Sequence, residues 1–327
     1  MSDDRRIVTS PVRVAATVAE AAVKAAEGYA SQALSEATLR AYRSDWAQFR
    51  DWCVATGLQP LPAEPSTVAA YLASMANSHS RATLRRRLVA IGQVHRLSGY
   101  VWSAAHPAIR NTLRGILRRH GAPARQAAAL TTADLRRLVG TCDGGLAGLR
   151  DRALLLLGYA GALRRAELVG VWREHIQITA DGMRLTIPRA KGDQEGQGAT
   201  IGISRGRHHE TCPVRALEAW LDQSDCAFGP VFRKVTMWGS VEHQALHPDA
   251  VRQILRRRAE ACGLVAEGGM HLSPHGLRAG FVTEAYRAGA RDEQIMEHTR
   301  HRDLKTMRGY VRRAQLVTES PVKLLGL

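Results

Sequence analysis

The sequence predicts a mainly helical protein with a small antiparallel β-sheet, built from an N-terminal helical domain and a C-terminal α+β domain. Three observations predict this class. Amphipathic segments with a helical period fill most of the chain, whereas segments rich in β-branched residues occur only near its middle. The length of 327 residues exceeds the ~100–200 residues typical of one domain, and the hydrophobic content of 45% is enough for two cores. A stretch containing Gly, Pro and small residues, without periodicity, separates the two regions.

The first domain is expected over residues 29–121, after a flexible arm at residues 1–28 that lacks a core-forming pattern. Its first helix carries an apolar stripe at helical period, with Ser35 as the expected N-cap and Gly57 as the expected stop. Three further amphipathic helices with short connections complete the domain: residues 66–77, capped by Ser66, residues 81–99 and residues 106–121.

The second domain is expected over residues 131–327, after a linker at residues 122–130. It begins with a helix capped by Thr132, and an apolar helix follows at residues 149–163. Two or three strands are expected, at residues 175–179, 183–190 and 199–204, with a turn at Asp181 and Gly182. Helices are expected at residues 213–223, 248–263, 274–289 and, as a basic stretch, 301–310.

The charge balance indicates a polyanionic partner. The chain has 46 Lys and Arg residues against 30 Asp and Glu residues, a net charge of +16. Both halves carry the excess, with 17 basic against 8 acidic residues in 1–125 and 29 against 22 in 126–327. Arginine supplies 41 of the basic residues, and its planar fork suits phosphate. Nucleic acid is therefore the expected partner, with a nonspecifically basic surface as the alternative.

The five cysteines predict neither a disulfide framework nor a zinc site. They are Cys53, Cys142, Cys212, Cys226 and Cys262, odd in number and without CxxC spacing. A reducing cytoplasm therefore fits this cysteine usage. No run approaches the ~18 apolar residues of a membrane span, and no signal-peptide pattern opens the chain. We expect a cytoplasmic protein without a membrane partner.

Six polar residues of the second domain occur in an order suited to phosphodiester chemistry. They are Arg164, Lys191, His275, Arg278, His301 and Tyr310, and Tyr310 stands nine positions after His301. Arginine, lysine and histidine supply donors for the non-bridging oxygens of a phosphate and an acid for its leaving oxygen. A tyrosine hydroxyl is a suitable nucleophile when cationic neighbours or a base assist it. Each pair alone also fits a solvated helix face, so the order and spacing carry the signal.

On these motifs the chain resembles the tyrosine recombinases of the phage-integrase family, over about residues 30–315. The matching segments are "LRRAEL", "RAKGDQEGQG", "HGLRAGF" and "HRDLKTMRGY". The resemblance implies that Arg164, His275, Arg278 and His301 bind and activate the phosphate, that Glu167 supports Arg164, that Lys191 protonates the leaving 5′ oxygen, and that Tyr310 is the nucleophile. It also implies a helical, SAM-like core-binding domain at the N-terminus and a tyrosine-recombinase catalytic domain at the C-terminus.

One position departs from the family pattern. The family usually has Gly immediately before its second histidine, where this chain has Arg300. His298 is the alternative candidate for that histidine, and the nine-residue spacing to Tyr310 favours His301.

The resemblance implies a site-specific DNA recombinase that works through a 3′-phosphotyrosine intermediate without ATP, metal or other cofactor. The expected partner is duplex DNA with an inverted-repeat site, bound by a monomer in free solution that becomes a homotetramer on paired sites. A tail at residues 317–327 is expected to dock on a neighbouring protomer. Candidate DNA contacts in the first domain are Arg40, Arg43, Arg85, Arg86 and Arg87, with a solvated face as the alternative for the last three. Other functions left open are a type IB topoisomerase and a catalytically silent DNA-binding regulator.

Overall fold

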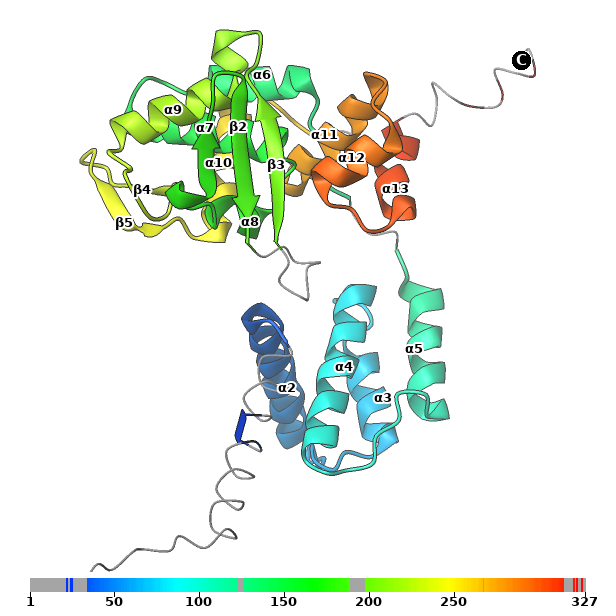
Figure 1. Ribbon diagram of the computed structural model, residues 1–327. Helices are drawn as coiled ribbons and strands as arrows, with labels where there is room; N and C mark the ends of the chain where they lie inside the picture. The colour runs from blue at the N-terminus through cyan, green and yellow to red at the C-terminus, as the bar shows by residue number, and fades with distance from the viewer. Residues whose placement is uncertain are drawn as a thin grey trace, which may run out of the picture. The chain divides into compact units, whose positions relative to one another are not determined.

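The computed structural model describes residues 22, 24–25, 34–122, 126–188, 198–266, 268–314, 320, 322 and 325. The chain divides into two compact units, Met1–Ala124 and Arg125–Leu327 (Figure 1). The fold is mainly helical with small antiparallel sheets, as the sequence predicts. Within the described part of the chain, no helix has the length and apolar character that crossing a membrane requires.

Residues 34–122 of the N-terminal unit contain four helices. They are α2 (Glu36–Thr56), α3 (Pro65–Ser74), α4 (Arg81–Leu97) and α5 (Pro107–His120). Ser35 caps α2 by accepting from the backbone N–H of Thr38 at 3.3 Å, and Gly57 ends it at φ 69°, so both predictions are confirmed. The expected cap Ser66 is wrong, because α3 already begins at Pro65. Proline at the first helical position lacks only an N–H that the helix leaves unused.

The core of this unit is aromatic at its centre. Phe49 of α2 is fully buried, and its ring lies 5.0 Å from the ring of Tyr71 in an edge-on arrangement. Leu72 of α3 and Ile91 of α4 are buried in the same cluster. The apolar stripe of α2 therefore packs against α3 and α4, which explains the helical period of the sequence here.

The C-terminal unit begins with α6 (Thr132–Gly140). Its N-cap is Thr131 rather than the expected Thr132. Thr131 accepts from the N–H of Asp134 at 3.1 Å, and the Asp134 carboxylate accepts from the N–H of Thr131 at 2.9 Å. This reciprocal pair is possible only when the cap lies three residues before the acidic group, which selects Thr131. The mostly buried α7 (Leu146–Ala160) follows, and then the short α8 (Arg165–Val169).

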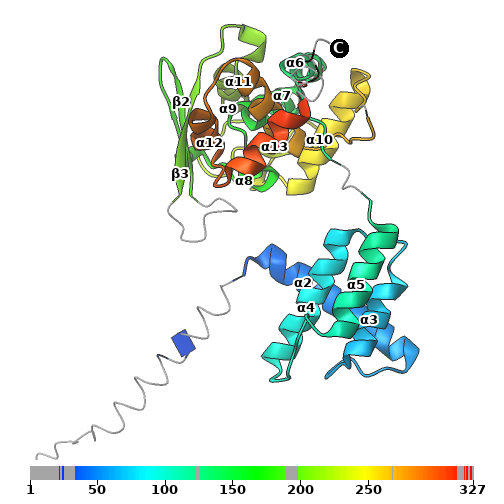
Figure 2. The same cartoon turned by 90° about the vertical axis from the view of Figure 1, so that its right-hand side faces the viewer.

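A three-stranded antiparallel sheet follows α8 in the order β1-β2-β3. The strands are β1 (Ile176–Ile178), β2 (Gly182–Ile187) and β3 (Ala199–Ser204), with the short helix η1 (Arg173–His175) before them and η2 (His209–Thr211) after them. Leu185 of β2 pairs with Ile176 and Ile201, and all three are buried. Figure 2 shows this sheet edge-on, with the helices on one side only. One face of the strands is therefore apolar and the other polar, the alternation from which they were predicted.

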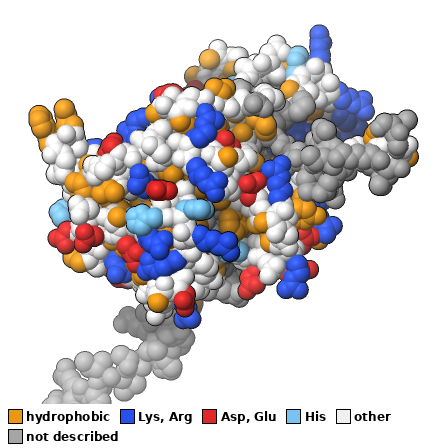
Figure 3. Space-filling model, turned by 90° about the horizontal axis from the view of Figure 1, so that it is seen from above, with side chains coloured by type: hydrophobic (Ala, Val, Ile, Leu, Met, Phe, Trp, Pro, Cys, Tyr) orange, Lys and Arg blue, Asp and Glu red, His pale blue; other side chains and the backbone are white. Residues whose placement is uncertain are grey.

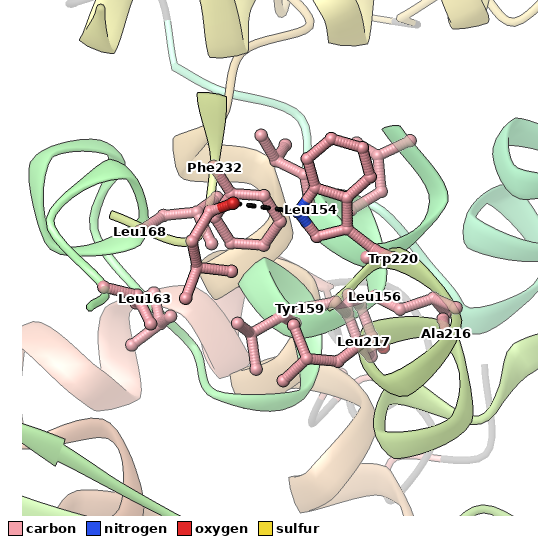
Figure 4. Close-up of a cluster of buried hydrophobic side chains, with 14 of the residues drawn as sticks. Leu154, Leu156, Tyr159, Leu163, Leu168, Ala216, Leu217, Trp220 and Phe232 are labelled. Atoms are coloured by element: carbon pink, nitrogen blue, oxygen red, sulfur yellow. Dashed lines mark hydrogen bonds between the residues drawn. The ribbon is translucent and has the colours of Figure 1, made fainter. Parts of the chain in front are cut away.

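The main core lies between the sheet and the helices. Trp220 of α9 (Pro213–Gln223) is fully buried beside Leu154 of α7 and Phe232 (Figure 4). Its indole N–H donates to the carbonyl of Val231 at 2.8 Å. This bond satisfies the one polar atom of the largest side chain in the core.

A second sheet of two strands was missed. It pairs β4 (Arg233–Val235) with β5 (Val241–Ala245) and precedes α10 (Pro248–Ala261). The sequence of β5, VEHQA, is polar and exposed along most of its length, so it carries no strong strand pattern.

The unit ends with three helices that lie side by side. They are α11 (His275–Arg287), α12 (Asp292–Thr299) and α13 (Leu304–Ala314). In α11, Gly280 lets the helix approach the carbonyl of Leu130, because an added Cβ would lie only 1.8 Å from that oxygen. The prediction of a helix over 301–310 was partly wrong, since α13 begins at Leu304 and His301 lies in the turn before it.

Candidate active site

The turn between α7 and α8 carries Arg164 and binds the side chain of Arg278 from α11. Ala162 has φ 45°, an uncommon conformation for a residue with a side chain, and its carbonyl accepts from Nη1 of Arg278 at 2.6 Å. Arg278 is 1% exposed, and among the described residues its Nη2 has no hydrogen-bond partner. Burial, together with the charges of Arg164 and Arg300, lowers the pKa of Arg278 to about 10. A buried cation with an unused donor is prepared to receive an anion.

Glu167 fixes the position of Arg164. The carboxylate accepts from Nη1 of Arg164 at 2.6 Å and from its backbone N–H at 2.9 Å. Burial would raise the pKa of Glu167, but the bonds from Arg164 and the charge of Arg300 outweigh it and lower that pKa. The carboxylate is therefore ionised at neutral pH. The Arg164 side chain stays 29% exposed, so it remains open to a ligand.

His275 and Tyr310 meet across two helices. Nε2 of His275, at the start of α11, lies 2.8 Å from the hydroxyl of Tyr310 in α13. Met307 and Val311 of α13 are buried against α11 and α12, which fixes the helix that carries the tyrosine. The Tyr310 hydroxyl can thus exchange a proton with His275 without any movement of the fold.

His301 lies beside the same tyrosine. Its ring centroid is 5.9 Å from that of Tyr310, and its Nδ1 is 2.6 Å from Oγ1 of Thr299. Because Thr299 donates its only hydroxyl proton to Ile295 at 2.6 Å, it accepts from Nδ1–H of His301. Burial and the charge of Arg278 lower the pKa of His301 to about 4.

His298 has a different environment. Its Nε2 lies 2.7 Å from the carbonyl of Ala160, and its ring stacks on Phe281 at 4.7 Å. Burial lowers its pKa. The ring of His298 is therefore engaged within the fold, whereas His301 faces Tyr310.

The structure brings together five of the six residues that the sequence selected. These are Arg164, His275, Arg278, His301 and Tyr310. The sixth, Lys191, lies outside the described residues. Two residues near the site were missed, Thr299 as the partner of His301 and Arg300 as a second partner of Glu167 at 2.9 Å. The only sequence signal for Arg300 was its departure from the usual glycine.

The candidate DNA contacts of the N-terminal unit divide into two groups. Arg40, Arg43 and Arg85 are exposed. Arg86 is half exposed and holds the buried Asp45 with two bonds of 2.7 and 2.9 Å. The prediction that Arg87 contacts DNA is wrong, because Arg87 is buried and donates to the Tyr71 hydroxyl at 2.7 Å. Its guanidinium is used within the domain.

On one face of the molecule the basic side chains do not gather into a single patch (Figure 3). On the face seen in Figure 3, Lys and Arg side chains are spread widely, with acidic side chains and histidines between them. The surface charge alone therefore does not locate the candidate site, which is identified by the contacts of its residues.

Comparisons with known proteins agree on one family. Residues 128–316 match the phage integrase family, and residues 29–97 match the phage integrase N-terminal SAM-like domain. The chain is 35% identical to an integrase/recombinase xerD homolog of Selenomonas ruminantium over 290 residues, 86% of this chain and 83% of the relative. It is 26% identical to the recombinase cre of Escherichia phage P1, covering 90% and 89% of the two chains.

Solved structures show the same fold. The crystal structure of a lambda integrase(75–356) dimer bound to a COC′ core site matches with a TM-score of 0.58 and 17% identity, over 87% of this chain and 92% of that one. The XerH site-specific recombinase bound to a palindromic difH substrate matches with a TM-score of 0.58 and 17% identity, over 81% and 73%. Since the family model matches more than half of its residues, this chain belongs to the phage integrase family and is a tyrosine-type site-specific recombinase, an enzyme that cleaves and rejoins DNA strands.

Proposed function

We propose that Tyr310 is the nucleophile of strand cleavage. Its hydroxyl oxygen forms a bond to the scissile phosphorus, and the bond from phosphorus to the 5′ oxygen breaks. The phenolic proton passes to a base, and the departing 5′ oxygen takes a proton from an acid. The products are a 3′-phosphotyrosine and a free 5′ hydroxyl, so the phosphodiester is kept as a covalent link and no nucleotide hydrolysis is needed.

The contact between His275 and Tyr310 carries this proposal. A separation of 2.8 Å is within range for direct proton transfer. The tyrosine also lies close enough to Arg278 for the two to interact electrostatically. A nucleophile, a base and a buried cation with an unused donor in one place fit attack on a phosphodiester.

The remaining residues are assigned to the two kinds of charge that develop. Arg164, Arg278 and His301 stabilise the non-bridging oxygens, which gain negative charge as Tyr310 attacks. Lys191 protonates the leaving 5′ oxygen. Since the neutral His301 ring carries its proton on Nδ1, it takes up a second proton at Nε2 when a phosphate binds beside it.

The proposed substrate is duplex DNA with an inverted-repeat recombination site in the bacterial cytoplasm. We propose that the protein is a monomer in free solution and a cyclic homotetramer on paired sites. A lambda integrase with the same fold has been solved as a tetramer bound to a Holliday junction, and this likeness supports the proposal. Here it predicts synapsis of two sites before strand exchange.

The tail at residues 317–327 is the proposed contact between protomers. Most of it lies outside the described residues, and Val322 and Leu325 are exposed within the described part. Deleting it is expected to preserve binding to a single site and to abolish synapsis, as native gel electrophoresis of DNA complexes measures. Lys323→Ala is the matched control, because it changes the tail but keeps its apolar residues, and it should form synaptic complexes normally. Normal recombination by the truncated protein would rule out this contact.

Cleavage is tested with the DNA site of this protein. That site is obtained by selecting bound duplexes from a random library with the Tyr310→Phe protein, which binds without reacting. A nicked duplex of the selected sequence then traps the covalent intermediate, because the short 3′ fragment diffuses away. We expect the natural protein and Tyr286→Phe, a control in the same apolar cluster, to form the adduct. An adduct with Tyr310→Phe would contradict the proposal.

A further inference from the structure

Arg300 has a conformation that is costly for an arginine. It ends α12 in the left-handed region, with φ 59° and ψ 41°. Its N–H donates to the carbonyl of Glu297 at 3.2 Å, and the next N–H donates to Met296 at 3.0 Å, which closes the helix end. Glycine adopts this conformation without a Cβ clash, whereas other residues are disfavoured there. An arginine here is therefore not explained by the turn itself.

The side chain of Arg300 reaches the site instead of solvent. It is 9% exposed, and its Nη2 donates to Oε2 of Glu167 at 2.9 Å. The same carboxylate binds Arg164 through its other oxygen at 2.6 Å. Glu167 is thus shared between two arginines, one from α12 and one from the turn before α8.

The sharing changes the charge of the site. With Arg164 alone, Glu167 would neutralise the arginine that it orients. The third guanidinium, after Arg164 and Arg278, leaves an excess of two positive charges around one carboxylate. A phosphodiester carries one negative charge, and a second develops during attack, so this excess matches the transition state better than the bound substrate.

We propose that Arg300 is a positioning residue of the phosphate site. It holds Glu167 and offsets the charge of that carboxylate, so that Arg164 keeps its orientation and its positive charge acts on the scissile phosphate. This inference rests on the proposed role of Arg164 and extends it. Arg300 acts through Glu167, and it is not expected to touch the DNA.

The test uses three variants and two forms of the nicked duplex selected above. Arg300→Gly removes the guanidinium and relaxes the backbone, so the turn is retained. Arg300→Lys keeps the charge, and Arg302→Ala removes an exposed charge two residues away as a control. One duplex has a normal scissile phosphate, and the other has a methylphosphonate there, which lacks the negative charge.

On the normal phosphate, we expect Arg300→Gly to bind within about twofold of the natural protein and to cleave roughly 10- to 100-fold more slowly, less than loss of a direct oxyanion donor. Arg300→Lys should recover most of the rate, and Arg302→Ala should cleave normally. On the methylphosphonate, the ratio of rates between natural protein and Arg300→Gly should fall to within a few-fold, because only the charge that develops during attack remains to be balanced.

Two outcomes would overturn the inference. A normal rate for Arg300→Gly removes any role for the side chain. If Arg300→Gly slows cleavage of both duplexes equally and Arg300→Lys does not restore the rate, Arg300 serves only to stabilise the fold. Neither outcome affects Tyr310, whose role fails only if the Tyr310→Phe protein forms a covalent adduct.

Discussion

Nε2 of His275 lies 2.8 Å from the hydroxyl oxygen of Tyr310, although the two residues are 35 positions apart in the sequence. The two helices that carry them are held by a separate apolar cluster that includes Val282, Ile295 and Met307. The contact is therefore preorganised before any DNA is bound. In our proposal it gives the tyrosine its proton acceptor.

His275→Gln is expected to slow cleavage about 100-fold or more, because a side-chain amide is too weak a base to accept the phenolic proton. Binding to the selected duplex should change little. The rate of adduct formation on the nicked duplex measures this effect, with His271→Gln as the control, since His271 pairs through its backbone and is exposed. Cleavage within about twofold of normal would remove His275 as the base.

His301 is expected to make stability depend on pH between about 4 and 6.5. Its pKa is lowered from 6.5 to about 4 in the folded protein, so the unfolded chain binds a proton in this range while the native state does not. Folding stability therefore falls as the pH falls through this window, and the contribution is fully present above it. The urea midpoint of His301→Asn should decrease less from pH 7 to pH 4 than that of the natural protein. Parallel curves would show that His301 is not buried as described.

Lys191→Ala is expected to slow cleavage of a normal phosphodiester, because the departing 5′ oxygen then lacks its proton donor. A duplex with sulfur as the bridging 5′ atom has a leaving group that needs no proton. The variant should therefore cleave this duplex at nearly the natural rate. If both duplexes are cleaved equally slowly, Lys191 binds the phosphate instead of protonating the leaving group.

Arg85 and Arg87 are close in sequence, but replacing Arg87 is expected to affect stability and replacing Arg85 to affect DNA binding. Arg87 is buried with Asp45 and Tyr71, so Arg87→Ala should lower the free energy of unfolding by about 2–4 kcal/mol. Arg85 is exposed, so Arg85→Ala should leave stability unchanged and lower the slope of log affinity against log salt by about 1. Thermal unfolding and binding at several salt concentrations separate the two effects. An unchanged salt slope for Arg85→Ala would exclude a phosphate contact.

Local signals in the sequence were sufficient for much of the fold. Strand β3 and helix α9 have the predicted bounds, since each is a strongly patterned segment flanked by turn residues or proline. The caps Ser35 and Gly57 act through neighbours within a few residues, so they too could be predicted. Strands β4 and β5 could not, because both are short and mostly polar in sequence and so carry no clear strand pattern.

The candidate site shows the same limit. The order of its polar residues predicted which side chains would meet, and five of them do. The bond from Arg300 to Glu167, by contrast, joins residues that are 133 positions apart in the chain. In the N-terminal unit, the bond that holds the buried Arg87 to Tyr71 likewise joins two different helices. No local pattern encodes such contacts, so only the folded chain reveals them.

The role of Tyr310 as the nucleophile is tested most directly by identifying the residue that becomes linked to DNA. The adduct from the nicked duplex is digested with nuclease and trypsin, and the modified peptide is sequenced by mass spectrometry. Trypsin cuts after Arg308 and Arg312, so we expect a nucleotide on the tyrosine of the peptide Gly-Tyr-Val-Arg, residues 309–312. A nucleotide on any other peptide, with this one recovered unmodified, would contradict it.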